Sequence, residues 1–407
     1  MDNILSQLSP MKNGKELLSA MTVLPSYDPN IRAQPSTARL MSLSDLYNIY
    51  IPSSMSVEIY SKLYLALLRS LQKKSGTLAQ ILRNKNHKRI IQCESNSVLG
   101  GADSFTVIGV SGIGKSTAIN RAIDLITEQG LLKNSHTKII PCLVVQTPHD
   151  CSVKGLLLEI LRKVDTFLDS DYYQKALKNR VTTEMLIGNV SQIALNHIGL
   201  LVVDEIQNVV NNKNGKALIA MLTQLINSSG ISICMVGTPE CALFFEQAMQ
   251  LARRALGIYY SAEEYDQFFY DFCATLFQYQ YVKNKTEISG GIIQWLYDHS
   301  NGIISVVVSL IHDAQEIAIL NGTETLDLNT LNEAYKNRLT MLHRYISLPS
   351  KPVHRKKKSE QQVPATEVGE KPALNEKIFD LVCTAKERNC DIVSFLQKKI
   401  KIEVITI

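Results

Sequence analysis

This 407-residue sequence lacks the marks of a membrane or secreted protein. No stretch approaches the roughly 18 uninterrupted apolar residues of a membrane span. The N-terminus, MDNILSQLSPMKNGKELL, does not show the basic residues followed by an apolar run that a signal peptide has. We therefore predict a cytoplasmic protein with no membrane partner.

Cysteine pairs and a strong charge of either sign are also missing. The eight cysteines are scattered, with no C-x-x-C and no Cys/His cluster at zinc spacing, so we expect reduced thiols and no structural metal. The net charge of +5 neither requires nor excludes nucleic acid. The 45% apolar and 20% charged residues are typical of a soluble globular chain with a large core and room for a smaller second domain.

The most informative stretch is GVSGIGKST, which has the form G-x-x-x-x-G-K-[ST] of a phosphate-binding loop. An apolar run precedes it and an amphipathic helical pattern follows, so the order is strand, loop, helix. Glycines let backbone N–H groups turn toward a triphosphate, Lys115 reaches the outer phosphates, and Ser116 can ligate Mg²⁺. A plain Gly-rich turn that opens a helix is the alternative. The predicted ATP-binding residues are Gly109, Ser111, Gly112, Ile113, Gly114, Lys115, Ser116 and Thr117.

Strand and helix patterns alternate from about residue 104, which predicts an α/β fold with a mostly parallel sheet. Further buried strands are expected at 138–146, 200–205 and 231–236, and the residues from about 240 to 345 are predicted to be helical. The first 45 residues are polar and interrupted by prolines, so they are predicted to be loop-like.

The chain is predicted to divide into five segments. A Pro- and charge-rich stretch with little to bury separates the folded part from a C-terminal stretch that regains apolar periodicity. The segments are a mostly helical N-terminal extension (1–95), a nucleotide-binding core (96–280), a helical lid (281–347), a flexible linker (348–373) and a partner-docking segment (374–407).

Acidic residues at the end of a predicted strand complete a hydrolytic site. Asp204 and Glu205 follow four apolar strand residues, so Asp204 can hold Mg²⁺ beside the phosphate loop and Glu205 can act as general base toward water. Thr238 ends the next strand, where it either senses the γ-phosphate or caps a turn before Pro239. An ordinary strand end is the alternative for the acidic pair.

In this order, the phosphate loop, VVDE, GTPE, ARRALG and a helical C-terminal part resemble an AAA+ ATPase. The stretches LLVVDEIQNV, MVGTPE and YDHSNGIISVVVSLIHDAQEIAI resemble more closely TnsC, the ATPase regulator of Tns-type cut-and-paste transposons, and its TniB relatives. The resemblance covers about 50–345. One departure is clear: many AAA+ lids carry G-x-x-R, whereas this chain has Ser305 in place of the arginine.

The resemblance implies that ATP-bound subunits assemble as a hexameric ring or helical filament around duplex DNA of any sequence. They then mark the target, recruit and activate transposase subunits with a target-selection protein, and disassemble on hydrolysis. In such a ring, Arg253 or Arg254 could act as an arginine finger in trans, with an exposed basic pair as the alternative. The positions implied to face DNA are Lys154, Lys178, Arg180 and Thr182, and a solvated basic loop is the alternative for each.

Two other functions are compatible with the sequence. A helicase loader or replication initiator of the same fold would share the ATPase site, although no convincing helix-turn-helix is evident at either end. A nucleotide-switched scaffold would bind no DNA, which Glu205 and the arginine pair argue against because they favour a hydrolytic site.

Overall fold

The computed structural model describes six stretches of the chain, 4–75, 104–134, 137–178, 181–210, 212–242 and 255–338. The chain divides into two compact units, residues 1–348 and 349–407. The second unit, and with it the predicted linker and docking segment, lies outside the described residues.

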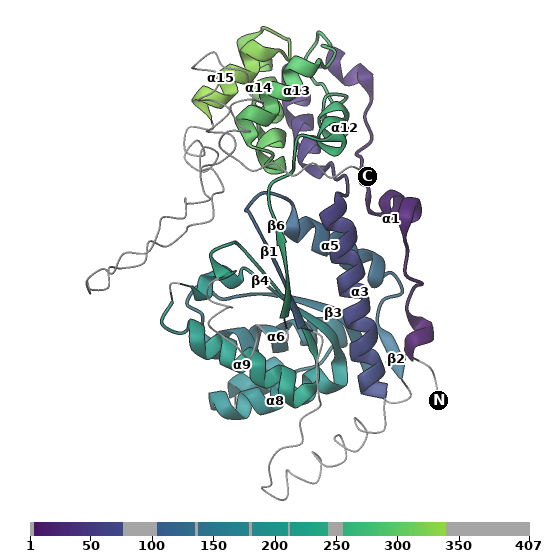
Figure 1. Cartoon of the computed structure of the whole chain (residues 1–407), viewed down its shortest axis with the longest axis vertical. Coiled ribbons are helices and arrows are strands. Elements are labelled where there is room, and N and C mark those ends of the chain that lie inside the picture. The colour runs from purple at the N-terminus through teal and green to yellow at the C-terminus, as the bar shows by residue number, and fades with distance from the viewer. Residues whose placement is uncertain are drawn as a thin grey trace, which may run out of the picture. The chain divides into compact units, whose positions relative to one another are not determined.

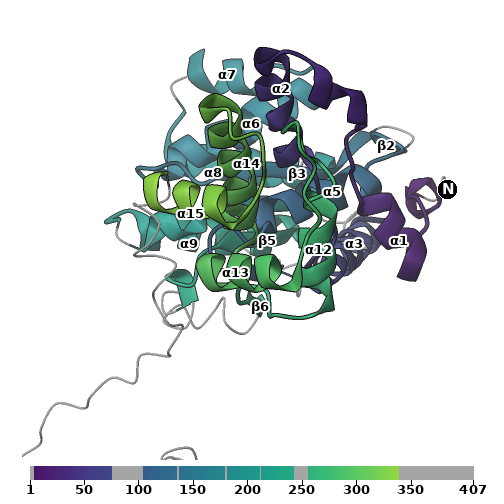
Figure 2. The same ribbon diagram turned by 90° about the horizontal axis from the view of Figure 1, so that it is seen from above.

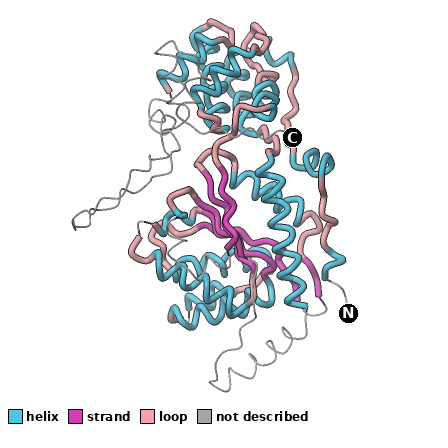
Figure 3. Tube along the Cα trace, in the orientation of Figure 1, coloured by secondary structure: helices cyan, strands magenta, loops and turns pink. Residues whose placement is uncertain are grey.

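A six-stranded sheet forms the centre of the first unit (Figure 3). Its order is β2-β3-β4-β5-β1-β6, with β2 antiparallel to β3 and the other pairs parallel. The predicted α/β fold with a mostly parallel sheet is confirmed. The strands are β1 (Ser104–Gly109), β2 (Leu132–Asn134), β3 (Thr137–Gln146), β4 (Ile198–Asp204), β5 (Ser232–Gly237) and β6 (Ala255–Tyr260).

The pairing register aligns the carboxyl ends of the strands. Ile108 pairs with Gly237, and Gln146 pairs with Asp204. The loops after β1, β4 and β5 therefore open at one edge of the sheet, with β5 between the other two strands. In parallel sheets this edge is where ligands bind.

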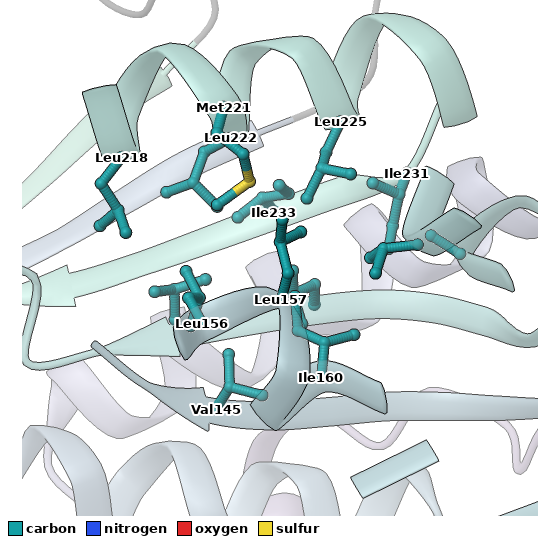
Figure 4. Close-up of a cluster of buried hydrophobic side chains, with 14 of the residues drawn as sticks. Val145, Leu156, Leu157, Ile160, Leu218, Met221, Leu222, Leu225, Ile231 and Ile233 are labelled. Atoms are coloured by element: carbon teal, nitrogen blue, oxygen red, sulfur yellow. The ribbon is translucent and has the colours of Figure 1, made fainter. Parts of the chain in front are cut away.

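Helices cover both faces of the sheet (Figure 1). One face carries α6 (Val153–Leu168), α7 (Tyr172–Lys178), α8 (Thr183–His197) and α9 (Gly215–Ser229). The other carries α1 (Gly14–Met21), α3 (Ser54–Ser75) and α5 (Lys115–Ile126). Figure 4 shows the first interface, where Leu218, Leu222 and Leu225 of α9 point toward Ile233 of β5 and Leu157 of α6. Burying both faces explains why the strands are near-continuous apolar runs.

A separate helical subdomain follows the sheet. Its helices are α12 (Gln267–Leu276), α13 (Gly290–Ser300), α14 (Ile304–Asn321) and α15 (Leu328–Asn337). Phe269 and Phe272 of α12 belong to its apolar core, so this packing begins before the lid boundary predicted at residue 281. By length and composition α14 could cross a membrane, but 56% of it is buried as the central helix of this core.

The prediction that residues 1–45 are loop-like is wrong. This segment contains α1, α2 (Ser36–Ser42) and three short 3-10 helices at Ile4–Gln7, Pro29–Ala33 and Leu43–Asn48. Proline excludes a long helix but is compatible with the first turn of a short one, as Pro29 shows. Leu17 and Met21 pack under the sheet, whereas Leu43 and Leu46 pack in the helical subdomain. Figure 2 shows α2 beside α14.

The prediction that residues 240–345 are entirely helical is also wrong. β6 lies in this region and pairs along its whole length with β1. Its aromatic and β-branched residues favour a strand. The strand forms by pairing with β1, about 150 positions earlier in the chain, and periodicity within a short window does not report such a partner.

Candidate functional site

The phosphate loop folds as its glycines require. Gly112 and Gly114 adopt φ of +84° and +93°, a region that other residues rarely occupy. A Cβ on Gly109 would lie 2.8 Å from Ile113 Cδ1 and 2.9 Å from the Tyr260 carbonyl oxygen. Ile113 is buried in the apolar core on the α5 face and thus anchors the loop.

Lys115 begins α5 and turns back over the loop. Its Nζ donates to the carbonyl oxygens of Gly109 (2.7 Å) and Val110 (2.8 Å), and the residue is 9% exposed. Burial lowers the pKa of this ammonium, while Asp204 and Glu205 act in the opposite direction. The ammonium therefore donates to two carbonyl oxygens, and a phosphate oxygen can take their place as the acceptor.

Asp204 joins the phosphate loop to the end of β4. Ser116 Oγ donates to Asp204 Oδ2 over 2.9 Å, and the Glu205 backbone N–H donates to Asp204 Oδ1 over 2.8 Å. A hydroxyl and a carboxylate are the oxygen ligands that Mg²⁺ prefers. The residues present thus fit Mg²⁺, which would be held by Ser116 and Asp204.

Glu205 is exposed at the mouth of the site in an uncommon backbone conformation, with φ of +57°. Its Oε2 accepts a hydrogen bond from Gln207 Nε2. Gln207 Oε1 is buried without a partner among the described residues. Gln207 was not among the predicted site residues; its place two residues after Glu205 is the local signal for it.

Thr238 has features of both predicted roles. It follows β5 and faces the phosphate loop, yet its Oγ1 donates to Glu240 Oε2, and its carbonyl oxygen accepts the Cys241 N–H in a turn. Thr238 therefore lies close to the phosphate loop, with its hydroxyl bonded to Glu240.

A cavity of about 270 Å³ lies between these groups. Most predicted site residues line it, together with Gln207, Gly237 and Ser305, which were not predicted. The predicted residues brought together here are Ser111, Gly112, Gly114, Lys115, Ser116, Thr117, Asp204, Glu205 and Thr238.

A second cavity of about 210 Å³ shares four lining residues with the first, Gly112, Gly114, Thr117 and Ser305. Its other walls come from residues 47–56, from Glu263 and α12, and from α14. It is mostly apolar and adjoins the phosphate loop, so its shape suits the nucleoside end of a nucleotide. No local motif marks these residues, because they come from three distant parts of the chain.

Ser305 stands at the lid position where a G-x-x-R motif would have its arginine. It contacts the phosphate loop directly. Its backbone N–H donates to the Gly112 carbonyl oxygen over 3.0 Å. A Cβ on Gly112 would lie 2.2 Å from Ser305 Oγ and 2.9 Å from Ile303 Cγ2. The lid thus reaches the loop by close backbone packing rather than through a long cationic side chain.

The structure describes three of the four residues predicted to face DNA, Lys154, Lys178 and Thr182. Lys154 is exposed in the first turn of α6, and Lys178 is exposed at the end of α7. Thr182 is the N-cap of α8, where its Oγ1 accepts from the Met185 N–H. Arg180, Arg253 and Arg254 lie outside the described residues.

Three asparagine amides connect this region to the segment that follows Glu205. Asn208, Asn212 and Asn214 donate to the backbone carbonyl oxygens of Thr147 (3.2 Å), His149 (3.3 Å) and Asp150 (3.1 Å). The 147–150 turn, which leads into Lys154, is therefore held against the 206–214 segment.

Comparisons with known proteins give one family match. Residues 100–259 match the family model described as bacterial TniB protein. No curated protein matches the chain.

Several solved structures are similar to this chain. The chain is similar to the Aeropyrum pernix ORC1 protein in complex with DNA, at 13% identity and a TM-score of 0.43, and spans 63% of that protein's length with 63% of its own. It is similar to Drosophila ORC bound to DNA, at 14% identity and a TM-score of 0.40, with 83% of this chain and 71% of that chain covered. A structure describing katanin self-assembly matches at 15% identity and a TM-score of 0.38, with 78% and 96% covered.

Proposed function

Because residues 100–259 match the family model described as bacterial TniB protein, we propose that the protein is an AAA+ ATPase that acts as an ATP-dependent regulator of transposition. It assembles on target duplex DNA as a ring or filament and recruits and activates transposase subunits, with a target-selection protein as a further partner. ATP hydrolysis drives its disassembly. The observation that carries the catalytic part is the Ser116–Asp204 contact, which joins the phosphate loop to the acidic strand end.

The chain supplies each group that hydrolysis needs. The loop N–H groups and Lys115 bind the phosphates of ATP, and Glu205 accepts a proton from the attacking water. Mg²⁺, held by Ser116 and Asp204, would neutralise charge on the phosphates. The hydrogen bond from Gln207 Nε2 to Glu205 Oε2 orients this carboxylate, whose other oxygen can accept the proton.

A neighbouring subunit completes the site in this proposal. A further cavity of about 560 Å³, lined partly by Gln207, Thr238 and Glu240, adjoins the phosphate cavity. Arg253 or Arg254 of the next subunit enters there and stabilises transition-state charge.

DNA contact is coupled to hydrolysis through the asparagine contacts. Lys154, Lys178, Arg180 and Thr182 contact DNA phosphates without reading sequence. The turn before Lys154 is bonded to Asn208 and Asn212, so a shift on DNA binding is transmitted toward Glu205.

Negative-stain imaging of the full chain with random-sequence duplex DNA tests this function. Rings or filaments are expected with ATP or a slowly hydrolysed analogue and not with ADP. Lys115→Ala should abolish assembly because the phosphates lose their ammonium partner, and Glu205→Gln should leave persistent assemblies in ATP because hydrolysis stops. Lys216→Ala, at an exposed position of α9, is the control. Nucleotide binding without DNA association in any state would reject the proposal in favour of a nucleotide-switched scaffold.

A further inference from the structure

The GTPE stretch after β5 ends in Glu240, whose carboxylate takes no part in the proposed hydrolysis. Glu240 is exposed, and its Oε2 accepts a hydrogen bond from Thr238 Oγ1. It lines the cavity of about 560 Å³ beside the phosphate cavity, here called the outer cavity, and it is the one carboxylate among the described residues there. A negative group therefore lies next to the ATP site, on its outer side.

Thr238 stands between the two cavities. It lines both the phosphate cavity and the outer cavity, whereas Glu240 is among the described lining residues of the outer cavity alone. A turn fixes the backbone here, because the Cys241 N–H donates to the Thr238 carbonyl oxygen over 3.1 Å. The hydroxyl of Thr238 is thus bonded to a group on the outer side, although the residue also faces the phosphate cavity.

A helix cap does not explain this hydrogen bond. In a cap the hydroxyl oxygen accepts a backbone N–H from two or three residues later, as Thr182 does from Met185. Thr238 Oγ1 accepts no backbone N–H among the residues that the structure describes, and it donates to a side chain instead. Its single proton is therefore used by the Glu240 carboxylate.

The same proton is the one that Thr238 would donate to a γ-phosphate. A phosphate oxygen and a carboxylate oxygen are both anionic acceptors, and hydrogen bonds to such acceptors are the stronger class. Rotation about χ1 moves the threonine oxygen between staggered positions. Because a hydroxyl donates one hydrogen bond at a time, the bond to Glu240 and a bond to the γ-phosphate exclude each other.

The charge of Glu240 also acts on the phosphate loop. Burial lowers the pKa of the Lys115 ammonium, and the Glu240 carboxylate is among the groups that oppose this shift. A triphosphate brings more negative charge toward Lys115 than a diphosphate does. The hydrogen bond to Thr238 and the charge of Glu240 must therefore be separated by experiment.

We propose that Glu240 is a positioning residue that acts through Thr238. Its carboxylate withholds the Thr238 hydroxyl from the γ-phosphate and so weakens the preference of the protein for ATP over ADP. The inference rests on the proposed function, because it concerns the γ-phosphate end of the same ATP site.

Calorimetric binding of ADP and of the β,γ-imido analogue of ATP, each with Mg²⁺, to the full chain measures this preference without hydrolysis. Glu240→Ala should raise the affinity for the analogue relative to ADP about tenfold, the size of one hydrogen bond to a charged group. Glu240→Gln should raise it less, because an amide oxygen still accepts from the hydroxyl.

Thr238→Val separates the hydrogen bond from the charge. Valine has no hydroxyl to release, so adding Glu240→Ala to Thr238→Val should change the relative affinity less than about twofold. In Thr238→Ser, which keeps the hydroxyl, Glu240→Ala should again give the larger increase. An equal increase with and without the hydroxyl would overturn the proposal, because the charge of Glu240 alone would then explain it.

Glu128→Ala is the matched control, because Glu128 is exposed and is not among the described residues that line either cavity. It should keep the relative affinity of the unchanged protein. An unchanged relative affinity in Glu240→Ala, with both nucleotides bound, would overturn the role of Glu240 alone. Failure of the unchanged protein to bind either nucleotide would overturn the ATP site and the proposed function with it.

Discussion

Gly112 lies where the phosphate loop meets the lid, and two constraints act on it. Its φ of +84° excludes most side chains, and the lid residues Ile303 and Ser305 fill the space that a Cβ would need. The consensus of the loop explains the first constraint, but only the packed lid explains the second.

Gly112→Ala should lower the free energy of unfolding by about 2–5 kcal/mol, from backbone strain and overpacking together. Gly130→Ala is the control, since Gly130 has φ of +74° but open space around it; it should cost about 1–2 kcal/mol. Urea unfolding measures both changes. Adding Ser305→Ala to Gly112→Ala should recover part of the loss, and no recovery would mean that the lid contact is not the cause.

At the scale of elements, the N-terminal segment binds the helical subdomain through a buried ion pair. Arg39 of α2 donates to both Glu324 carboxylate oxygens at 2.7 Å and to the Tyr281 carbonyl oxygen at 3.0 Å. The side chains are 2% and 12% exposed. The N-terminal segment, whose residues 47–56 form one wall of the apolar cavity beside the phosphate loop, is thus fixed to the lid.

Arg39→Met should destabilise the protein by about 3–5 kcal/mol at neutral pH, because Glu324 is left charged and poorly solvated. Lys283→Met should cost less than about 1 kcal/mol, because Lys283 is 60% exposed and lies 3.7 Å from Glu324. Chemical unfolding of the two variants and the unchanged protein compares these effects. Equal losses of unfolding free energy in the two variants would show that the buried ion pair stabilises the protein no more than the exposed one.

The same pair makes stability depend on pH. The hydrogen bond that Glu324 accepts from Arg39 lowers the pKa of Glu324 below the ordinary value of 4.5. The stabilisation is therefore present above about pH 4.5 and is lost as pH falls through the lowered pKa in the folded protein. The difference in the free energy of unfolding between the unchanged protein and Arg39→Met should become smaller in this acid range. A difference that stays constant would show that the ion pair is not the source of the pH dependence.

At the scale of the whole molecule, the proposed DNA contact is electrostatic. Lys154 and Lys178 are exposed on the side of the sheet that carries α6 and α7. Phosphate contacts of this kind make affinity fall steeply with salt. The small net charge of +5 does not oppose this, because only the local charges matter.

Lys178→Ala should reduce the slope of log affinity against log salt by about 1, because one phosphate contact is lost. Lys175→Ala on the same helix is the control, since Lys175 already pairs with Asp171 at 2.6 Å; it should change the slope less. Fluorescence anisotropy with duplex DNA at several salt concentrations gives the slopes. A flat salt response of the unchanged protein would reject the DNA-facing residues.

The local parts of the site could be predicted because their signals are short. The loop from Gly109 to Thr117 and the strand end at Asp204 each need only a few neighbouring residues to be recognised. The alternation of strand and helix patterns likewise indicated the parallel sheet, and its strands are continuous apolar runs because both faces are buried.

The sequence by itself determined the phosphate loop, the acidic pair after β4 and the class of the fold, because each depends on chemistry within one turn or one strand. Only the tertiary structure decided that β6 joins the sheet, that residues 27–51 pack with the lid, and that residues 47–56 and Glu263 share a cavity. Those features depend on contacts between residues far apart in the chain. Periodicity and motif spacing are local quantities, so they cannot report such contacts.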